Sequence, residues 1–181
     1  MKHTVHAVLA MATVALATLI VSSVIQYKMD SIDKVKQSHA GITMAELDRQ
    51  LKCMADNIYW EAASEPVEGK IAVAQVVMNR VAHPDFPKTV CGVVQQKSII
   101  ANRLVCQFSW LCENTYKTRP KYAPLYNESM EVAKKVYLEK FRLPSLRGAL
   151  YYHADYVSPQ WQFHKVAKIG RHIFYEPKGR A

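Results

Sequence analysis

The sequence predicts an α+β fold, in which a helical body is followed by a small β region near the C-terminus and preceded by one apolar N-terminal segment. Apolar residues recur at helical spacing between residues 44 and 81 and again between 127 and 141. After Pro144, short runs of β-branched and aromatic residues replace that spacing. The first 26 residues contain a long uncharged stretch that neither pattern explains.

The N-terminal stretch from Ala7 to Ile25 has 19 residues and no charge. As a helix it would be roughly 28 Å long, close to the hydrocarbon thickness of a bilayer. Lys2 precedes it, and a positive N-terminus favours leaving that end in the cytoplasm. We therefore predict a signal-anchor or transmembrane segment over 1–26, a polar linker over 27–41 and a folded domain over 42–181. The domain would lie on the periplasmic or extracytoplasmic side of the inner membrane.

Two alternatives to a retained anchor remain open. Ala15 and Ala17 form a candidate A-x-A site for cleavage of a signal peptide, although it lies inside the apolar run. Thr18, Ser22 and Ser23 also make the stretch only weakly hydrophobic. Such a segment could insert into the membrane and later leave it.

Four cysteines predict two disulfides. Cys53, Cys91, Cys106 and Cys112 contain no CxxC pair, so a structural zinc site is not expected. An even number of cysteines in an exported domain is typical of disulfides. Three pairings are open, and the sequence selects none of them.

The formal net charge of +9 indicates an anionic partner. Basic surfaces attract nucleic acid, anionic lipid or an anionic cell-wall polymer. The sequence has no zinc finger, helix-turn-helix or RNP-type motif, so nucleic acid is not expected.

The first helix of the domain places a carboxylate on its apolar face. The stripe continues in phase to Glu61, near the helix C-terminus, where the macrodipole disfavours an anion. Burial and the dipole both raise the pKa of a carboxyl group. A carboxylic acid that stays protonated near neutral pH is what a glycosidase needs to protonate its leaving group. The alternative is an exposed helix-end carboxylate. The stripe consists of Met44, Leu47, Leu51, Met54 and Ile58.

The other elements follow in order along the chain. A second, nearly fully buried helix begins at Pro66 and is broken by the run 83–87, with Glu65 and Glu68 as its cap or first-turn residues. Residues 97–125 lack periodicity and are predicted to form a long ordered loop, which in a compact domain is usually functional. The remaining predictions are a short helix or turn over 89–95, a helix over 127–141, and strands over 149–152, 162–167 and 172–175, with Gly170 at a hairpin turn.

Several ordered motifs resemble one known family. They are NIYWEAASEP at 57–66, GKIAVAQVVMNRV at 69–81, FPKTVCGVV at 86–94, CQFSW at 106–110, YHA at 152–154 and IGRHIFY at 169–175. Together these motifs are similar to the spore-cortex-lytic, SleB-like family of cell-wall hydrolases. The resemblance extends over roughly residues 50–176.

The resemblance implies a lysozyme-related fold and action on peptidoglycan by a catalytic domain over 42–181. It also implies that Glu61 is the catalytic acid, as in lytic transglycosylases of that type, which cleave between N-acetylmuramic acid and N-acetylglucosamine. No metal or other cofactor is expected. Trp60 stands where the family often has Gly, Phe or Tyr, which points to an altered sugar subsite.

Five residues are predicted to bind the substrate. Gln107 and Ser109 are expected to hydrogen-bond acetamido groups, unless they only form a turn. Tyr152 and His153 are expected to line the cleft, unless they belong to the core. Trp161 is expected to stack on a sugar ring, and packing among core aromatic residues is the alternative.

Three functions compete at this point. The first is cleavage of the glycan strand by a lytic transglycosylase or muramidase, in a phage endolysin or a bacterial wall-remodelling enzyme. The second is an amidase-type cell-wall hydrolase, which would normally need zinc or a Cys/His pair. The third is a non-catalytic wall-binding protein. The expected partners are peptidoglycan glycan strands and, through the N-terminal segment, a membrane.

Overall fold

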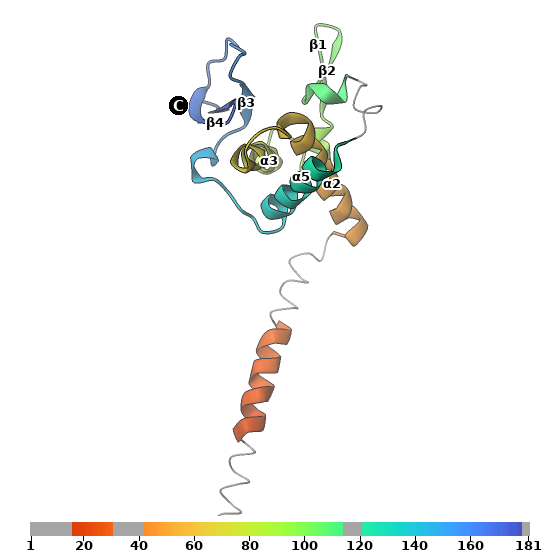
Figure 1. Cartoon of the computed structure of the whole chain (residues 1–181), viewed down its shortest axis with the longest axis vertical. Helices are drawn as coiled ribbons and strands as arrows, with labels where there is room; N and C mark the ends of the chain where they lie inside the picture. Colours follow the sequence, from red (N-terminus) through yellow and green to blue (C-terminus); the bar gives the residue numbers. More distant parts are fainter. Residues whose placement is uncertain (1–15, 31–41, 114–120, 179–181) are drawn as a thin grey trace, which may run out of the picture. The chain divides into compact units, whose positions relative to one another are not determined.

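The computed structural model describes residues 16–30, 42–113 and 121–178 and divides the chain into two compact units, Met1–Met44 and Ala45–Ala181 (Figure 1). In the first unit, residues 16–30 form one exposed helix. The hydroxyls of Ser22 and Ser23 each donate to a carbonyl one turn earlier, at 2.7 Å. These polar groups are therefore satisfied within the helix itself.

The structure describes only part of the predicted apolar segment over 7–25. Residues 16–25 are helical, whereas residues 7–15 lie outside the described residues. Within 16–30, 42–113 and 121–178, no helix combines the length and the apolar character needed to cross a membrane.

The second unit is built around one buried helix. α3 (Val67–Ala82) uses one face to contact the core formed by the other helices, and its opposite face contacts residues of the C-terminal sheet and the segment before it. Pro66 precedes α3, and His83 ends it with an extended backbone, as expected for a residue before proline. The predicted start and break of this helix are confirmed. The other helical elements are α2 (Met44–Ala62), α4 (Val90–Val94), η1 (Ser109–Leu111), α5 (Ala123–Tyr137) and η3 (Pro144–Leu146).

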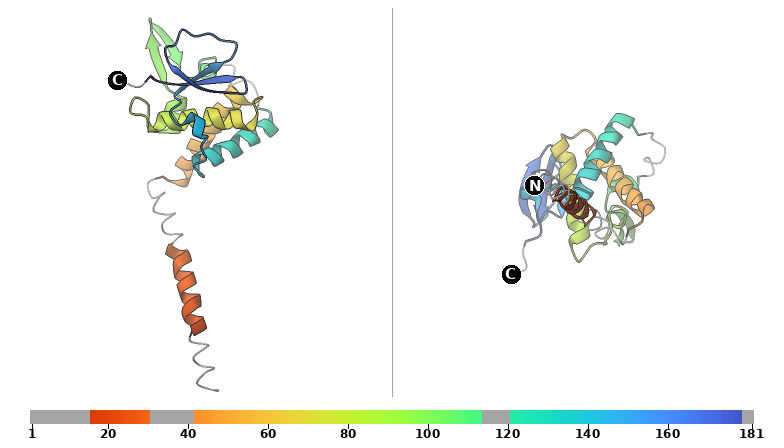
Figure 2. Two further views of the ribbon diagram at one scale, coloured as in Figure 1. Left: turned by 90° about the vertical axis from the view of Figure 1, so that its left-hand side faces the viewer. Right: turned by 90° about the horizontal axis from the view of Figure 1, so that it is seen from below.

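Two small antiparallel sheets project from the same side of the helices (Figures 1 and 2). The first is a hairpin of β1 (Lys97–Ile100) and β2 (Arg103–Cys106). The second has the order β3-β5-β4. Its strands are β3 (Tyr151–Ala154), β4 (His164–Ile169) and β5 (His172–Glu176). The predicted combination of a helical body and a C-terminal β region is confirmed, with a second small sheet added.

The prediction of a loop over 97–125 is wrong, because residues 97–106 form the β1–β2 hairpin. Ile99 lies opposite Leu104, and their side chains are 77% and 60% exposed. A hairpin that packs neither face against a core has no reason to alternate apolar and polar residues. The period-2 signal was therefore missing. Ala101 and Asn102 form the turn with φ values of 48° and 61°.

The helix predicted over 127–141 lies four residues earlier, over Ala123–Tyr137. Pro124 occupies its first turn, where a missing N–H costs nothing. Lys140 adopts a positive φ of 59°, which a continuing helix does not allow. The chain therefore leaves the helix before Phe141.

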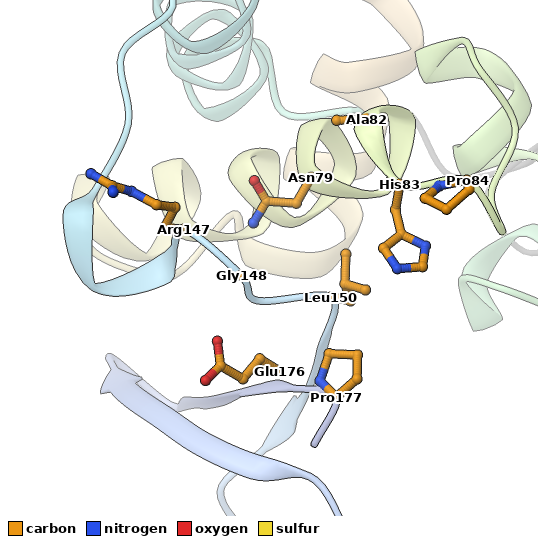
Figure 3. A pocket seen from close by; sticks show the side chains of 9 residues that line it. All are labelled: Asn79, Ala82, His83, Pro84, Arg147, Gly148, Leu150, Glu176 and Pro177. Atoms are coloured by element: carbon orange, nitrogen blue, oxygen red, sulfur yellow. The ribbon is translucent and has the colours of Figure 1, made fainter. Parts of the chain in front are cut away.

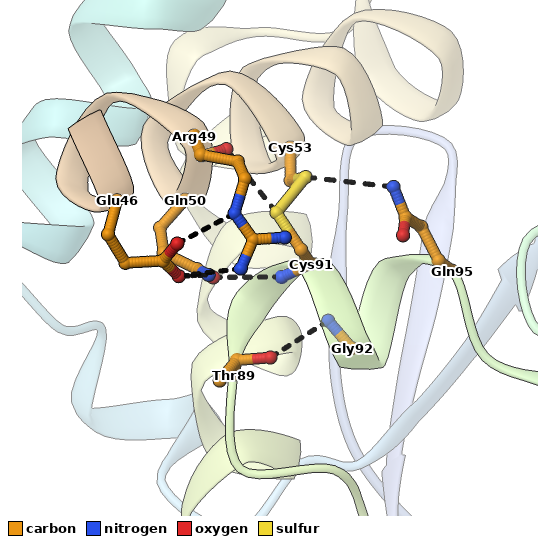
Figure 4. Close-up of a disulfide and its surroundings, with 8 residues drawn as sticks. All are labelled: Glu46, Arg49, Gln50, Cys53, Thr89, Cys91, Gly92 and Gln95. Carbon is orange, nitrogen blue, oxygen red and sulfur yellow. Dashed lines mark hydrogen bonds and ion pairs between the residues drawn. A yellow bond between two sulfur atoms is a disulfide. The ribbon is translucent and has the colours of Figure 1, made fainter.

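Both predicted disulfides are present, with two distinct roles. Cys53–Cys91 joins α2 to α4 across 38 residues (Figure 4). Beside it, the side-chain oxygen of Gln50 accepts a hydrogen bond from the backbone N–H of Cys91 at 2.9 Å. Cys106–Cys112 closes a loop of only 6 residues after β2. The first disulfide ties the helices together, and the second shapes the segment that contains Gln107.

Candidate active site

Glu61 lies in the last turn of α2 and contacts a residue of the C-terminal sheet. The phenol of Tyr152, on β3, donates a hydrogen bond to Oε2 of Glu61 at 3.0 Å. The last turn of α2 contains no basic residue. No side chain of that turn therefore offsets the negative end of the helix macrodipole. The fold brings together a helix-end carboxyl and a strand phenol that are 91 residues apart.

The environment of Glu61 favours its protonated form. Burial raises the pKa of this carboxyl above its usual value of 4.5. The hydrogen bond from Tyr152 and the positive charge of Arg80 oppose the shift, whereas the charge of Glu113 adds to it. Because burial is the largest effect, Glu61 keeps its proton at pH values where an exposed glutamate has lost it.

The Tyr152 phenol is held from the core side of the sheet. Its ring packs against His172 and Phe174, with centroid distances of 5.2 and 5.6 Å. Burial, together with the charge of Glu61, raises the pKa of Tyr152 well above its usual value. Burial also lowers the pKa of His172. Tyr152 therefore remains a hydrogen-bond donor beside a neutral imidazole.

A buried arginine interacts electrostatically with Glu61. Arg80, in the last turn of α3, is only 3% exposed. Its Nε donates to the carbonyl of Leu150 at 2.8 Å. Three aromatic rings surround the guanidinium, and its carbon lies 5.4 Å from the centroid of Phe86, 5.4 Å from Phe108 and 5.8 Å from Tyr151.

Arg80 was not among the predicted site residues. Among the described residues, none of the ion pairs involves it. Burial lowers the pKa of the guanidinium, and the charge of Glu61 opposes that shift. A signal was available, because Arg80 follows Val77 by three residues on a helix that the sequence predicted to be nearly fully buried. Glu61 was identified as a charged residue on a buried helix face, and the same criterion applies to Arg80.

Gln107 contacts the Arg80 guanidinium, whereas Ser109 does not contact it directly. When the Gln107 amide is assigned the orientation that satisfies both partners, its side-chain oxygen accepts from Nη1 and Nη2 of Arg80 at 3.1 and 3.2 Å. Ser109 begins η1, and its carbonyl accepts from the backbone N–H of Cys112 at 2.9 Å. Its side chain is exposed. Trp110 belongs to the core, where its indole N–H donates to a buried amide of α2.

Tyr152 and His153 point to opposite faces of β3, as adjacent strand residues must. The Nε2 atom of His153 lies 2.9 Å from the phenol oxygen of Tyr175. Trp161 lies on the same outer face, with its ring centroid 5.4 Å from His153 and 5.8 Å from Tyr175. Trp161 is 41% exposed, so the outer face carries an accessible aromatic cluster. Phe163 extends this cluster.

Glu65 has a structural role. Its Oε2 accepts a hydrogen bond from the backbone N–H of Arg171 at 2.9 Å. Gly170, between β4 and β5, has a φ of +56°, and a Cβ there would lie 1.9 Å from the same oxygen. Glu65 therefore connects the turn between α2 and α3 to the β4–β5 hairpin.

A cavity of about 440 Å³ lies between the end of α3 and the end of β5 (Figure 3). Its lining contains none of the predicted site residues. Within the part of the chain that the structure describes, no three His, Cys, Asp or Glu side chains gather to hold a metal ion. The cavity is lined by Asn79, Ala82, His83, Pro84, Arg147, Gly148, Leu150, Glu176 and Pro177.

Sequence relatives are cortex-lytic enzymes. The chain is 26% identical over 133 residues to a spore cortex-lytic enzyme of Bacillus subtilis (strain 168), covering 71% of this chain and 38% of that protein. It is 29% identical over 128 residues to the spore cortex-lytic enzyme of Bacillus cereus, covering 68% and 43%. The chain thus spans about two fifths of the length of these curated relatives.

The fold is similar to two solved catalytic domains. One is the catalytic domain of the Bacillus cereus SleB protein, with a TM-score of 0.53 and 25% identity over 75% of this chain and 93% of that one. The other is the catalytic domain of the germination-specific lytic transglycosylase SleB from Bacillus anthracis, with a TM-score of 0.54 and 26% identity over 75% and 98%. The cell wall hydrolase family matches residues 64–175, a range that begins three residues after Glu61. The resemblance inferred from the motifs is confirmed, and the chain belongs to the cell wall hydrolase family.

Proposed function

We propose that this chain cleaves the glycan strand of peptidoglycan as a lytic transglycosylase, with Glu61 as general acid and then general base. The observation that carries the proposal is the Glu61 carboxyl, whose pKa is raised by burial and which accepts a hydrogen bond from Tyr152. The relatives are cortex-lytic enzymes, and one similar structure is a lytic transglycosylase domain. Both names agree with this chemistry.

The site supports a two-step reaction. Protonated Glu61 donates its proton to the glycosidic oxygen while the bond to the anomeric carbon breaks. Negative charge then develops on Glu61, where the Tyr152 phenol donates to it and the Arg80 guanidinium stabilises it electrostatically. The carboxylate next removes a proton from a hydroxyl of the same sugar. That oxygen closes on the anomeric carbon, gives an anhydro end and leaves Glu61 protonated again.

The state of the other carboxylates favours a transglycosylase over a muramidase. Glycosidases that use water or a covalent intermediate usually need two carboxylates at the scissile bond. Here Glu65 binds a backbone N–H of the β4–β5 turn. Asp155 pairs with Lys168 at 2.9 Å. The negative charge of Glu113 raises the pKa of Glu61. A transglycosylase needs one carboxyl, which Glu61 supplies.

The substrate contacts are proposed on the same basis. Gln107 and Ser109 would bind acetamido groups beside Arg80, and Tyr152 would contact the sugar next to Glu61. His153 and Trp161 would bind a more distant part of the strand, because they occupy the outer face of the sheet.

Analysis of soluble products from purified cell wall tests the proposal. Anhydro-muramic ends are expected in the wild type and absent in Glu61→Gln. Reducing muramic ends would instead indicate a muramidase, and free stem peptides an amidase. A folded protein that binds wall and releases nothing would be a wall-binding protein. Any of these three outcomes contradicts the proposal.

We further propose that residues 7–25 hold the chain at the inner membrane, with the catalytic domain on the extracytoplasmic side, as in an endolysin or a wall-remodelling enzyme. The uncharged stretch after Lys2 and the two disulfides support this location. Expression in a Gram-negative host, with fractionation and protease treatment of spheroplasts, tests it. A domain that stays protected from external protease would contradict the proposal.

A further inference from the structure

The proposed mechanism uses Arg80 only through its charge, but its geometry implies a second role. A guanidinium has five N–H groups in a rigid planar fork. Nε–H binds the carbonyl of Leu150, and Nη1 and Nη2 both bind the side-chain oxygen of Gln107. The aromatic rings around the group restrict it further. Arg80 is therefore held in one orientation before any substrate binds.

This arrangement determines which way the Gln107 amide faces. The opposite orientation would set its NH₂ group against the guanidinium, donor against donor, which is unfavourable. With the oxygen bound to Arg80, the amide nitrogen points away from it. The backbone is held as well, because the Gln107 N–H donates to the carbonyl of Gln96 at 2.9 Å and the Cys106–Cys112 disulfide adjoins it. Gln107 itself is exposed. Its side-chain amide consequently presents only N–H donors to an incoming ligand.

We propose that Arg80 is a positioning residue that fixes the Gln107 amide so that its N–H groups bind a carbonyl oxygen of the substrate, namely that of an acetamido group. This inference rests on the proposed function, because only then is the ligand a glycan strand rich in acetamido groups. It adds a selection rule. The site recognises N-acetylated sugars through an acceptor, and a free amine at that position offers the wrong hydrogen-bonding group.

Gln107→Glu is the most informative variant, because it keeps an oxygen for Arg80 and removes both donors. On soluble N-acetylated glycan strands, kcat/KM should fall about tenfold, the effect of losing one hydrogen bond of roughly 1.4 kcal/mol. Gln107→Met removes both functions without adding charge and should fall at least as far. Gln95→Glu is the matched control, since Gln95 is an exposed glutamine at the end of α4. It should stay within twofold of the wild type.

Strands with the acetamido groups removed provide the decisive comparison. The wild type should lose about tenfold on these strands, whereas Gln107→Glu should lose nothing or gain, because its carboxylate then faces an ammonium. A second set of strands, treated with an amidase, keeps the acetamido groups and lacks the stem amide. The ratio of wild type to Gln107→Glu should be unchanged there. A changed ratio would assign the carbonyl to the stem peptide and contradict the acetamido assignment.

Arg80→Lys tests the positioning role directly. Lysine keeps the charge near Glu61 but not the fork, so acetamido selectivity should fall while the pH profile stays unchanged. If Arg80 had only a structural role, Arg80→Lys would lower stability and leave the acetamido selectivity unchanged. If Arg80→Lys does not fold, the Gln107 variants still decide the matter. Should Glu61→Gln be inactive while Gln107→Glu keeps wild-type selectivity, the inference fails and the proposed function stands. Full activity of Glu61→Gln would instead refute the proposed function.

Discussion

A single carboxyl in the last turn of α2 carries the proposed chemistry, so the sharpest prediction concerns Glu61. Glu61→Gln keeps the shape of the side chain and removes the transferable proton. Release of muropeptides should fall by at least about 10²–10⁴-fold, the usual contribution of general acid catalysis. Stability should hold or rise, because a half-buried ionisable group is replaced by a neutral amide.

Activity assays and thermal melts on purified Glu61→Gln check both parts of this prediction. Glu68→Gln is the control, since Glu68 is exposed in the first turn of α3 and should retain near-normal activity. Near-normal turnover by Glu61→Gln would remove the basis of the proposed mechanism.

The pH dependence follows from the same residue. Because burial raises the pKa of Glu61 in the folded protein, folding favours the protonated form, and stability is lost as pH rises through the folded pKa. The stability advantage of Glu61→Gln over the wild type should therefore grow from pH 4 to pH 8. Activity should fall over the same rise, because the acid loses its proton.

Tyr152→Phe tests the hydrogen bond that opposes the effect of burial on the pKa of Glu61. The hydrogen bond from Tyr152 lowers the pKa of Glu61, so its removal should move the alkaline limb of the pH–rate profile to higher pH. The maximum rate should also fall, since the developing carboxylate loses a donor. A limb that moves to lower pH would show that the phenol does not act on this carboxyl.

At the scale of elements, the two disulfides should contribute unequally. Cys53–Cys91 spans 38 residues and Cys106–Cys112 spans 6. The loop-entropy relation gives about 4 kcal/mol for the first and about 2 kcal/mol for the second. Paired Cys→Ala variants, measured by urea unfolding, should show this order. Four titratable thiols in the native exported protein would contradict both bonds.

The β4–β5 turn requires a glycine at position 170. Gly170→Ala should cost about 1–2 kcal/mol from its positive φ alone, and more because a Cβ there would displace the Glu65 carboxylate. Urea unfolding of the single variants and of the double variant with Glu65→Ala separates the two effects. The penalty of Gly170→Ala should shrink in the Glu65→Ala background. An equal penalty in both backgrounds would exclude the steric contribution.

For the whole molecule, a fragment of residues 42–181 should fold alone, stay soluble and degrade purified wall. The motivation is the division into two units, with the second beginning at Ala45. Sedimentation, far-UV circular dichroism and muropeptide release measure the three properties. Aggregation or loss of the helical spectrum would mean that the N-terminal segment belongs to the core.

Much of this molecule was predictable because its elements bury one face. The apolar stripe of α2 predicted both the helix and the unusual position of Glu61, and α3 was evident from its continuous apolar residues. The β1–β2 hairpin could not be predicted, because all of its strand residues except Cys106 are exposed and it has no alternation to detect. The lysozyme relationship and the membrane segment remain predictions.

What the sequence by itself determined is the α+β organisation, the presence of four cysteines for two bonds, the family and the carboxyl most suited to act as an acid. These properties depend on local spacing and on ordered motifs. The tertiary structure decided which cysteines pair, that Tyr152 faces Glu61 while His153 faces outward, and that Arg80 joins Gln107 to the site. Such contacts connect residues far apart in the chain, and their energies depend on burial and orientation that local patterns do not encode. The period of the apolar residues predicts which face of a helix or strand is buried, whereas only the packed structure shows which residues that face contacts.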